Sequence, residues 1–288
     1  MANISLNVFC SGRLGEAVLK KLLANPAFNI VGALTDHSSV EIINRVKEHG
    51  IPIHVGNPRR NNFSNKLVPA DILISANYFF ILPDSILELA NKMAINIHGS
   101  LLPKYMGRTP NTWVIINDEV KTGITVHEII KEVDAGDIIY QEEIPILNND
   151  TAGTLTEKMM ERYPEIAEKI IFDIVKRNIN KKKQDLLKKT YCCKRDPSDG
   201  LVNWDWSSRK IYNWVRAQTR PYPGAFFIYK KSKYTLWWVE DCYDKMDSSG
   251  LEKGIPFEKD GNVYIKCGIG SVKVVDFEIS KISEGGVI

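Results

Sequence analysis

The first 140 residues alternate short apolar runs with segments of helical periodicity, and this alternation limits the possible folds more than any other feature. The apolar runs cover residues 5–10, 29–34, 71–75 and 94–97, and the helical segments cover residues 16–23, 39–49 and 83–92. Strands that are separated by helices of about ten residues form βαβ units. The pattern therefore predicts an α/β fold with a mostly parallel, Rossmann-like sheet, whose ligands bind at the carboxyl ends of the strands.

The rest of the chain predicts a second, smaller unit. Two more strands are expected at 121–130 and 138–146, and helices at 151–177 and 204–218. The stretch Lys176–Arg195 holds nine Lys and Arg residues and one acidic residue, Asp185. From Ala225 onwards, short alternating runs are separated by turn residues, which is typical of a small β domain. We expect a first domain at 1–180 that carries catalysis, a basic linker at 181–200 and a β-rich, open-barrel-like domain at 201–288.

Composition describes an ordinary globular chain. Of 288 residues, 44% are hydrophobic and 25% are charged, and the net charge is +3, which demands neither nucleic acid nor a membrane surface. The five cysteines form no CxxC pair, and the five histidines have no metal-ligand spacing, so we expect free thiols and no metal. No signal peptide or run of about 20 apolar residues is visible, so we expect a soluble, cytoplasmic protein.

The pair Asn96 and His98 is the first candidate for chemistry. Both follow a buried strand, and alternation along the strand directs both side chains to the same side. An amide and an imidazole in this position can donate hydrogen bonds to a developing oxyanion, and the imidazole can also move a proton. The alternative is that the pair only satisfies backbone groups at the end of the strand.

A second candidate is Asp134, in a segment that also holds His127 and Asp137. The sequence Asp134-Ala-Gly136 is typical of a turn, so a loop would orient the carboxylate. A carboxylate near His98 would favour the imidazolium form. The alternative is an aspartate that only caps a turn.

Taken together, these segments resemble the formyltransferase family that uses 10-formyltetrahydrofolate. The family pattern is met by these residues: Asn96, His98, Ser100, Leu101, Leu102, Pro103, Gly107, Gly123, Thr125, His127, Asp134, Gly136 and Asp137. The segment Arg216–Phe226 extends the resemblance into the C-terminal part. The resemblance implies a catalytic trio of Asn96, His98 and Asp134. In it, Asn96 and His98 stabilise the oxyanion that forms when an amine attacks the formyl carbon, and Asp134 orients His98 and helps to relay the amine proton.

The resemblance also implies a folate site in two loops. Its expected contacts are Tyr78, Phe79, Phe80, Ile81, Leu82, Val133 and Asp137. Their mostly apolar character suits a flat heterocycle. The alternative for the aromatic and aliphatic members is packing in the core.

Three acceptor amines occur in the family: methionyl-tRNA, glycinamide ribonucleotide and a nucleotide-linked amino sugar. The glycinamide enzymes lack a C-terminal β domain, and the tRNA enzymes carry a basic insertion after the second strand, where residues 35–39 here lead directly into a helix. The loop Leu101–Trp113 is similar to that of the sugar-nucleotide enzymes, although Met106 stands where an Arg is common. We therefore expect a sugar N-formyltransferase, with a dTDP-4-amino-4,6-dideoxy sugar as the substrate that the family implies.

Candidate contacts to such a substrate lie in three segments. They are Ser11, Gly12, Arg13, Lys104, Tyr105, Arg108, Thr109, Trp113 and Arg220. Arginine and lysine suit a diphosphate, aromatic rings can stack on a base, and glycines at a strand–helix turn can bring N–H groups to an anion. For each, the alternative is an ordinary surface or turn residue.

Partners complete the set of expectations. The resemblance implies folate and a nucleotide-linked amino sugar as ligands, a homodimer, and a product that enters O-antigen or another surface glycan. The basic stretch favours methionyl-tRNA as an alternative acceptor, because phosphate contacts need clustered Lys and Arg. A solvated linker without nucleic acid is the preferred interpretation. A non-catalytic folate-binding protein is the alternative of another class.

Overall fold

The computed structural model describes residues 3–60, 66–243 and 250–281, and in it the chain forms two compact units. The first unit comprises Met1–Gly107, Thr122–Ile144 and Thr156–Tyr191. The second comprises Arg108–Lys121, Pro145–Leu155 and Cys192–Ile288. The domain limits expected near residues 180 and 200 stay a prediction. No helix in the described ranges is long and apolar enough to cross a membrane.

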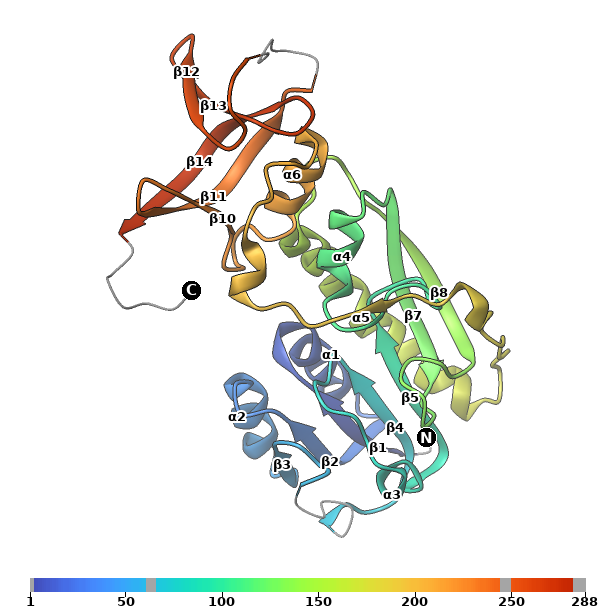
Figure 1. The fold of residues 1–288 in the computed structure, drawn as a ribbon. Coiled ribbons are helices and arrows are strands. Elements are labelled where there is room, and N and C mark those ends of the chain that lie inside the picture. The colour runs from blue at the N-terminus through green and yellow to red at the C-terminus, as the bar shows by residue number, and fades with distance from the viewer. Residues whose placement is uncertain (1–2, 61–65, 244–249, 282–288) are drawn as a thin grey trace. The chain divides into compact units, whose positions relative to one another are not determined.

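A seven-stranded sheet forms the centre of the first unit (Figure 1). Its strands are β1 (Ile4–Cys10), β2 (Phe28–Thr35), β3 (Ile53–Val55), β4 (Ala70–Ala76), β5 (Ala90–His98), β7 (Lys121–Glu128) and β8 (Ile138–Pro145). Their order is β3-β2-β1-β4-β5-β7-β8, and the pairs from β3 to β5 are parallel, whereas β7 runs antiparallel to β5. The predicted α/β fold with a mostly parallel sheet is confirmed.

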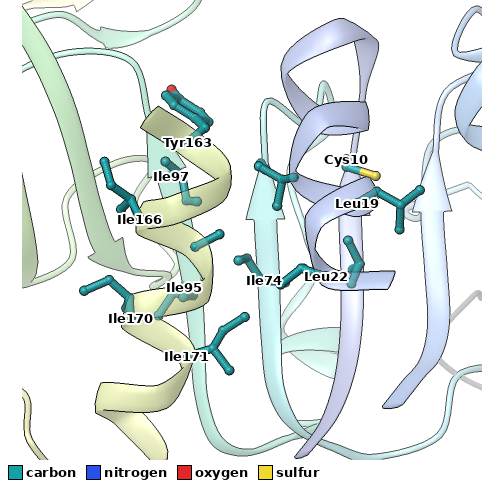
Figure 2. Packing of buried hydrophobic residues seen from close by; sticks show 14 of the residues in the cluster. Cys10, Leu19, Leu22, Ile74, Ile95, Ile97, Tyr163, Ile166, Ile170 and Ile171 are labelled. Carbon is teal, nitrogen blue, oxygen red and sulfur yellow. The ribbon is translucent and has the colours of Figure 1, made fainter. Parts of the chain in front are cut away.

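Three helices share one hydrophobic cluster with the sheet: α1 (Gly12–Ala24), α2 (Val40–Glu48) and α5 (Ala152–Val175). Figure 2 shows Leu19 and Leu22 of α1 and Ile170 and Ile171 of α5 facing the strands beneath them. Apolar residues three and four positions apart give each helix one buried face. Alternate residues of β1, β4 and β5 pack against these helices, and this packing fixes the positions of the strands.

The opposite face of the sheet carries a second cluster and the candidate chemistry. Phe9, Leu73 and Ala94 pack there with Ile86 of α3 (Asp84–Leu87). Because side chains alternate along a strand, Asn96 and His98 follow Ala94 on this face, while Ile95 and Ile97 face the helices. Rigid packing on one side of β5 therefore fixes the two polar side chains on its other side.

The helix expected at 83–92 is wrong in length. Only Asp84–Leu87 is helical, and β5 already begins at Ala90. The backbone N–H of Ala70 donates to Leu89 at 2.9 Å, and Ala70 pairs with Ala90. Pairing with β4 therefore competes with the helix and draws residues 90–93 into the sheet.

A five-stranded antiparallel sheet dominates the second unit, in the order β10-β11-β14-β13-β12. The strands are β10 (Ala225–Tyr229), β11 (Ser232–Asp241), β12 (Pro256–Lys259), β13 (Asn262–Lys266) and β14 (Ser271–Lys281). The predicted β-rich C-terminal part is confirmed. Two α-helices, α4 (Pro110–Ile116) and α6 (Ser208–Arg216), and the 3-10 helix η3 (Pro197–Gly200) complete the unit. The helix expected at 204–218 is shorter because Ser207 caps α6, accepting a hydrogen bond from the N–H of Lys210.

Short elements lie in the stretch expected to be a basic linker. They are the 3-10 helix η2 (Leu186–Lys188) and the strand β9 (Tyr191–Cys192), which pairs with β6 (Met106–Gly107). Residues 181–191 belong to the first unit, so this part of the chain packs with the sheet domain.

Candidate functional site

Four polar side chains meet at the carboxyl end of β5, and we call them the polar cluster: Asn96, His98, His127 and Asp134. Asn96 pairs in register with His127 of the neighbouring strand β7, so the two side chains lie on the same face. The Asn96 Nδ2 lies 3.1 Å from the His127 Nε2 and 3.4 Å from the Asp134 Oδ1. Residues that are 38 positions apart in sequence thus form one hydrogen-bonded group.

Asp134 lies in the loop between β7 and β8, where its φ of 56° is in the left-handed region. Its Oδ2 accepts a hydrogen bond from the N–H of Gly107 at 2.8 Å and lies 3.6 Å from the His98 Nδ1. Burial raises the pKa of this carboxyl, but the charge of His98 and the hydrogen bonds from His127 and Gly107 outweigh burial. The pKa of Asp134 is therefore well below its usual range, and the side chain is a carboxylate at neutral pH.

The His98 ring is 7% exposed and has an acceptor at each nitrogen. Its Nε2 lies 2.8 Å from the carbonyl oxygen of Tyr105, and its Nδ1 faces the Asp134 carboxylate. A neutral imidazole carries one N–H, so it could satisfy only one of these acceptors. The ring is held between the Asp134 carboxylate and a backbone carbonyl.

His127 has a different environment, and the sequence analysis gave it no role. Its Nδ1 lies 2.8 Å from the carbonyl oxygen of Glu128. Its Nε2 lies 3.1 Å from the Asn96 Nδ2 and 3.4 Å from the Asp134 Oδ1, so the ring contacts both side chains. The motif Gly123-Ile-Thr-Val-His127 marks this histidine in the sequence. Only the register between β5 and β7 shows that its ring lies beside Asn96.

The loop that follows β4 holds five of the expected folate contacts. Phe79 and Ile81 are exposed, whereas Tyr78 and Leu82 pack against the cluster beneath the sheet. The Tyr78 hydroxyl also donates to the carbonyl of Gly56 at 3.2 Å, and its ring contacts Phe80 edge to face. Tyr78 and Leu82 are half-buried, and the folate contacts expected in this loop stay a prediction. In the second expected loop, Val133 is exposed and Asp137 is half-buried.

The turn after β1 makes internal contacts at the start of α1. The N–H of Gly12 donates to the Ser39 hydroxyl at 2.9 Å, and that hydroxyl donates to Asp36 at 2.5 Å. Burial raises the pKa of Asp36, but hydrogen bonds from Ser38 and Ser39 outweigh this and lower it to about 2. A buried carboxylate therefore lies beside the turn, which disfavours an anion there. Ser11 is buried, and the exposed Arg13 pairs with Glu157 at 2.7 Å.

Lys104 and Tyr105 follow β5 in the first unit. Lys104 is exposed, whereas the Tyr105 side chain is only 8% exposed, so most of its ring is unavailable for stacking on a base. The φ of Tyr105 is 61°, and its N–H donates to the Thr190 hydroxyl at 2.8 Å. The backbone of this loop, through the Tyr105 carbonyl, is what reaches His98.

The remaining expected substrate contacts lie in the second unit. The Thr109 hydroxyl and the Trp113 indole N–H both donate to the Cys193 carbonyl, at 3.2 and 3.1 Å. The Arg195 guanidinium lies 5.2 Å from the centre of the Trp113 ring, so one face of the ring is covered.

Arg108 and Arg220, also in the second unit, are both exposed. Arg108 donates its backbone N–H to the Cys192 carbonyl at 3.0 Å. Arg220 pairs with Asp276 at 2.7 Å and lies 4.2 Å from the centre of the Trp237 ring. Its guanidinium therefore already contacts two residues of the C-terminal sheet.

The described residues contain no group of three or more His, Cys, Asp or Glu side chains that could hold a metal ion.

Comparison with known proteins identifies the family. Residues 3–171 match the formyl transferase family, and residues 194–284 match the C-terminal domain of formyl transferases. A curated relative, the bifunctional polymyxin resistance protein ArnA of Wigglesworthia glossinidia brevipalpis, is 35% identical over 251 residues. The match covers 83% of this chain and 38% of ArnA, so the chain spans about two fifths of the length of that relative.

Solved structures share the fold over nearly the whole chain. WlaRD, a sugar 3N-formyl transferase crystallised in the presence of dTDP and 5-N-formyl-THF, is 19% identical with a TM-score of 0.70, over 95% of this chain and 98% of that one. The N-formyltransferase of Helicobacter canadensis, in complex with folinic acid and dTDP-3-aminofucose, is 19% identical with a TM-score of 0.70, over 96% of this chain and 100% of that one. With the family matched over more than half of its length, this chain belongs to the formyl transferase family and is a formyltransferase.

Proposed function

We propose that this enzyme transfers a formyl group from 10-formyltetrahydrofolate to the amino group of a nucleotide-linked amino sugar. The observation that carries the proposal is the polar cluster, in which an amide and an imidazole lie beside one buried carboxylate at the end of β5. Donors that are held in advance where negative charge develops are the largest single contribution in many acyl-transfer enzymes.

The residues present fit a folate as the formyl donor. The strands β4 and β5 pair up to Ala76 and Ile97, so residues 77–82 and His98 leave the same edge of the sheet. In that loop Phe79 and Ile81 are 40% and 47% exposed, which offers an apolar surface for a flat ring. The bound folate would supply the formyl carbon, and Phe79, Ile81 and Val133 are the residues proposed to hold its ring.

The chain's own donors would act on the formyl oxygen. Asn96 would donate from its amide and His98 from its imidazole, which faces the Asp134 carboxylate. Both donors already have protein acceptors, since the His98 Nε2 faces the Tyr105 carbonyl. A substrate oxygen at His98 must therefore replace that carbonyl, and we propose that the loop after β5 shifts when substrates bind.

The acceptor that we propose is an amino sugar on a dTDP carrier, such as a 4-amino-4,6-dideoxy sugar. Support comes from the two structural neighbours, which were crystallised with dTDP or with dTDP-3-aminofucose together with a folate. The expected homodimer and the surface-glycan product belong to the same proposal. Lys104 and Arg108, both exposed, are the proposed contacts to the diphosphate.

Methionyl-tRNA is the weaker candidate acceptor, because much of the basic stretch is already paired. Lys181, Lys188, Lys189 and Lys194 form ion pairs with Glu128, Asp185, Glu132 and Asp196. The Arg195 guanidinium is stacked between Trp113 and Trp214. Neutralised charges bind phosphates poorly, so we propose that no nucleic acid binds here.

A direct test uses 10-formyltetrahydrofolate with a panel of dTDP-, UDP- and GDP-linked amino sugars and with charged methionyl-tRNA. We expect a formylated sugar nucleotide, detected by mass spectrometry, and no formylated tRNA. Asp134→Asn should abolish most of the turnover while the folate still binds. If that variant works at the wild-type rate, the proposed role of the polar cluster is wrong, and a non-catalytic role for these residues follows.

A further inference from the structure

The segment 181–191, which we call the strap, crosses the loop that carries Asp134. At one end, Lys181 pairs with Glu128 at 2.7 Å, and the backbone of Lys182 exchanges two hydrogen bonds of 2.8 Å with Ile138. At the other end, Lys189 pairs with Glu132 at 3.3 Å. The strap thus contacts the loop on both sides of Asp134.

Gln184 lies between these anchors and reaches the backbone of the catalytic loop. Its Nε2 donates to the carbonyl oxygens of Asp134 and Gly136, both at 2.7 Å. The reverse orientation of the amide would point its oxygen at two carbonyl oxygens, so the donor must face the loop. Leu186 of the strap also packs against the buried cluster of Leu102, Met106, Ala135 and Ile138, which includes a residue of the same loop.

The Gln184 amide lowers the stability of the folded state in a way that an apolar side chain would not. Its Oε1 is buried and has no hydrogen-bond partner among the described residues. A buried acceptor without a partner destabilises the folded state, and an apolar side chain of similar shape would not have this penalty. The two donated hydrogen bonds are therefore the property that distinguishes glutamine at this position from a methionine.

We propose that Gln184 is a positioning residue for the formyl transfer. It holds the loop of Asp134, whose φ is left-handed, so that the carboxylate keeps its contact with the His98 Nδ1 and its hydrogen bond from the Gly107 N–H. This inference rests on the proposed function for its effect on catalysis. Its structural part is independent of the proposed function, because the hydrogen bond of 2.8 Å from the Gly107 N–H to Asp134 joins two residues of this chain. The stretch that the sequence favoured as a linker would then be part of the catalytic unit.

The test replaces Gln184 by methionine, which keeps the length of the side chain, removes both donors and adds no charge. For Gln184→Met we expect kcat to fall at least about tenfold, because small displacements of catalytic groups have effects of this order. We expect KM for either substrate to change less than about twofold, since binding is not the affected step. The melting temperature should change little, because removal of the unpaired Gln184 oxygen offsets the loss of the donor to the Asp134 and Gly136 carbonyls. A loss of kcat without a loss of stability separates positioning from a structural role.

Lys188→Ala is the matched control in the strap, because the Lys188 side chain is 74% exposed and pairs with Asp185, at 2.9 Å, within the strap itself. It should keep the wild-type kcat. Hydrogen exchange of the Gly107 amide, followed by NMR without any substrate, should be faster in Gln184→Met and unchanged in Lys188→Ala. If the methionine variant is poorly folded, Gln184→Ala is measured in the same way.

The outcomes separate the two proposals. A wild-type kcat in Gln184→Met, or unchanged protection of the Gly107 amide, overturns the positioning role. If the wild-type enzyme formylates no sugar nucleotide, the proposed function fails, and the exchange of the Gly107 amide still decides whether Gln184 holds the loop.

Discussion

At the scale of single residues, Asp134 links the donors of the site. One of its oxygens faces His98 and the Gly107 amide, and the other faces Asn96 and His127. Asp134→Asn keeps the shape and removes the charge, so His98 loses its ionic partner. We expect kcat to fall by about 10²- to 10⁴-fold, the range of a lost acid–base group. Steady-state kinetics with the identified sugar nucleotide checks this, and an unchanged kcat contradicts it.

The low pKa of Asp134 also gives a prediction for stability. A carboxyl with a lowered pKa in the folded state stabilises the fold above its ordinary value, and this contribution is lost as the pH falls through the folded pKa. The contribution of this carboxyl to the difference in unfolding free energy between the wild type and Asp134→Asn should therefore decrease once the pH drops below about 4. Urea unfolding at a series of pH values measures it. A difference that stays constant as the pH falls below about 4 would contradict the lowered pKa of Asp134.

Gly136 leaves no room for a side chain. A Cβ at this position would overlap the carbonyl of Glu128, so the Asp134 loop would have to move. We expect Gly136→Ala to cost about 1–3 kcal/mol of stability, as overpacking does, and also to lose activity. Gly50→Ala is the control, because it has a φ of 65° but open space around it. It should cost about 1–2 kcal/mol through the left-handed backbone alone and keep full kcat. Equal kcat values in the two variants would contradict this account.

At the scale of elements, α5 stabilises the sheet that positions the cluster. Ile171 is fully buried in the cluster that packs on that sheet (Figure 2). Lys169 is exposed and pairs with Asp173 on the same helix. Ile171→Ala should destabilise the protein by about 2–5 kcal/mol, and Lys169→Ala by about 0.3–0.5 kcal/mol. Both should keep kcat at low temperature, because neither side chain belongs to the polar cluster. Chemical denaturation compares the two, and similar losses would show that α5 is not part of the core.

Element boundaries show what the sequence could and could not predict. The alternation of short apolar runs with helical segments predicted β1, β2, β4 and β5, because a strand that is covered on both faces reads as an apolar run. It did not predict the three-residue strand β3. It did not reveal that residues 90–93 join β5, since the pairing between Ala70 and Ala90 is a contact across 20 residues of chain. The motif residues Asn96, His98 and Asp134 were visible in the sequence. The contacts of His127 and Gln184 were not, because register and chain crossing decide them.

At the scale of the whole molecule, the second unit is built from three separate stretches of chain. Arg216, only 2% exposed, ties two of them together: its guanidinium donates to the carbonyls of Leu147 and Asp150 at 3.2 and 2.7 Å. Arg216→Met would leave these carbonyls without their donor. We expect a loss of about 3–5 kcal/mol, the range for breaking a buried charged contact, and thermal unfolding measures it. A change below about 1 kcal/mol would contradict the structural role of this arginine.

The same construction predicts how a divided chain behaves. A fragment of residues 194–288 lacks Arg108–Lys121 and Pro145–Leu155, which belong to its unit. We expect this fragment to show a broad or absent thermal transition, whereas the full chain unfolds cooperatively. Circular dichroism of the two proteins checks this, and a fragment as stable as the full chain would contradict it.

The central claim is that the polar cluster formylates an amino sugar on a nucleotide carrier. The most direct measurement is a competition assay in which limiting 10-formyltetrahydrofolate meets dTDP-linked amino sugars and charged methionyl-tRNA in one reaction. The account predicts that the formyl group appears on the sugar amine with the wild-type enzyme and that Asp134→Asn slows this at least about a hundredfold. Formylation of methionyl-tRNA alone would contradict it.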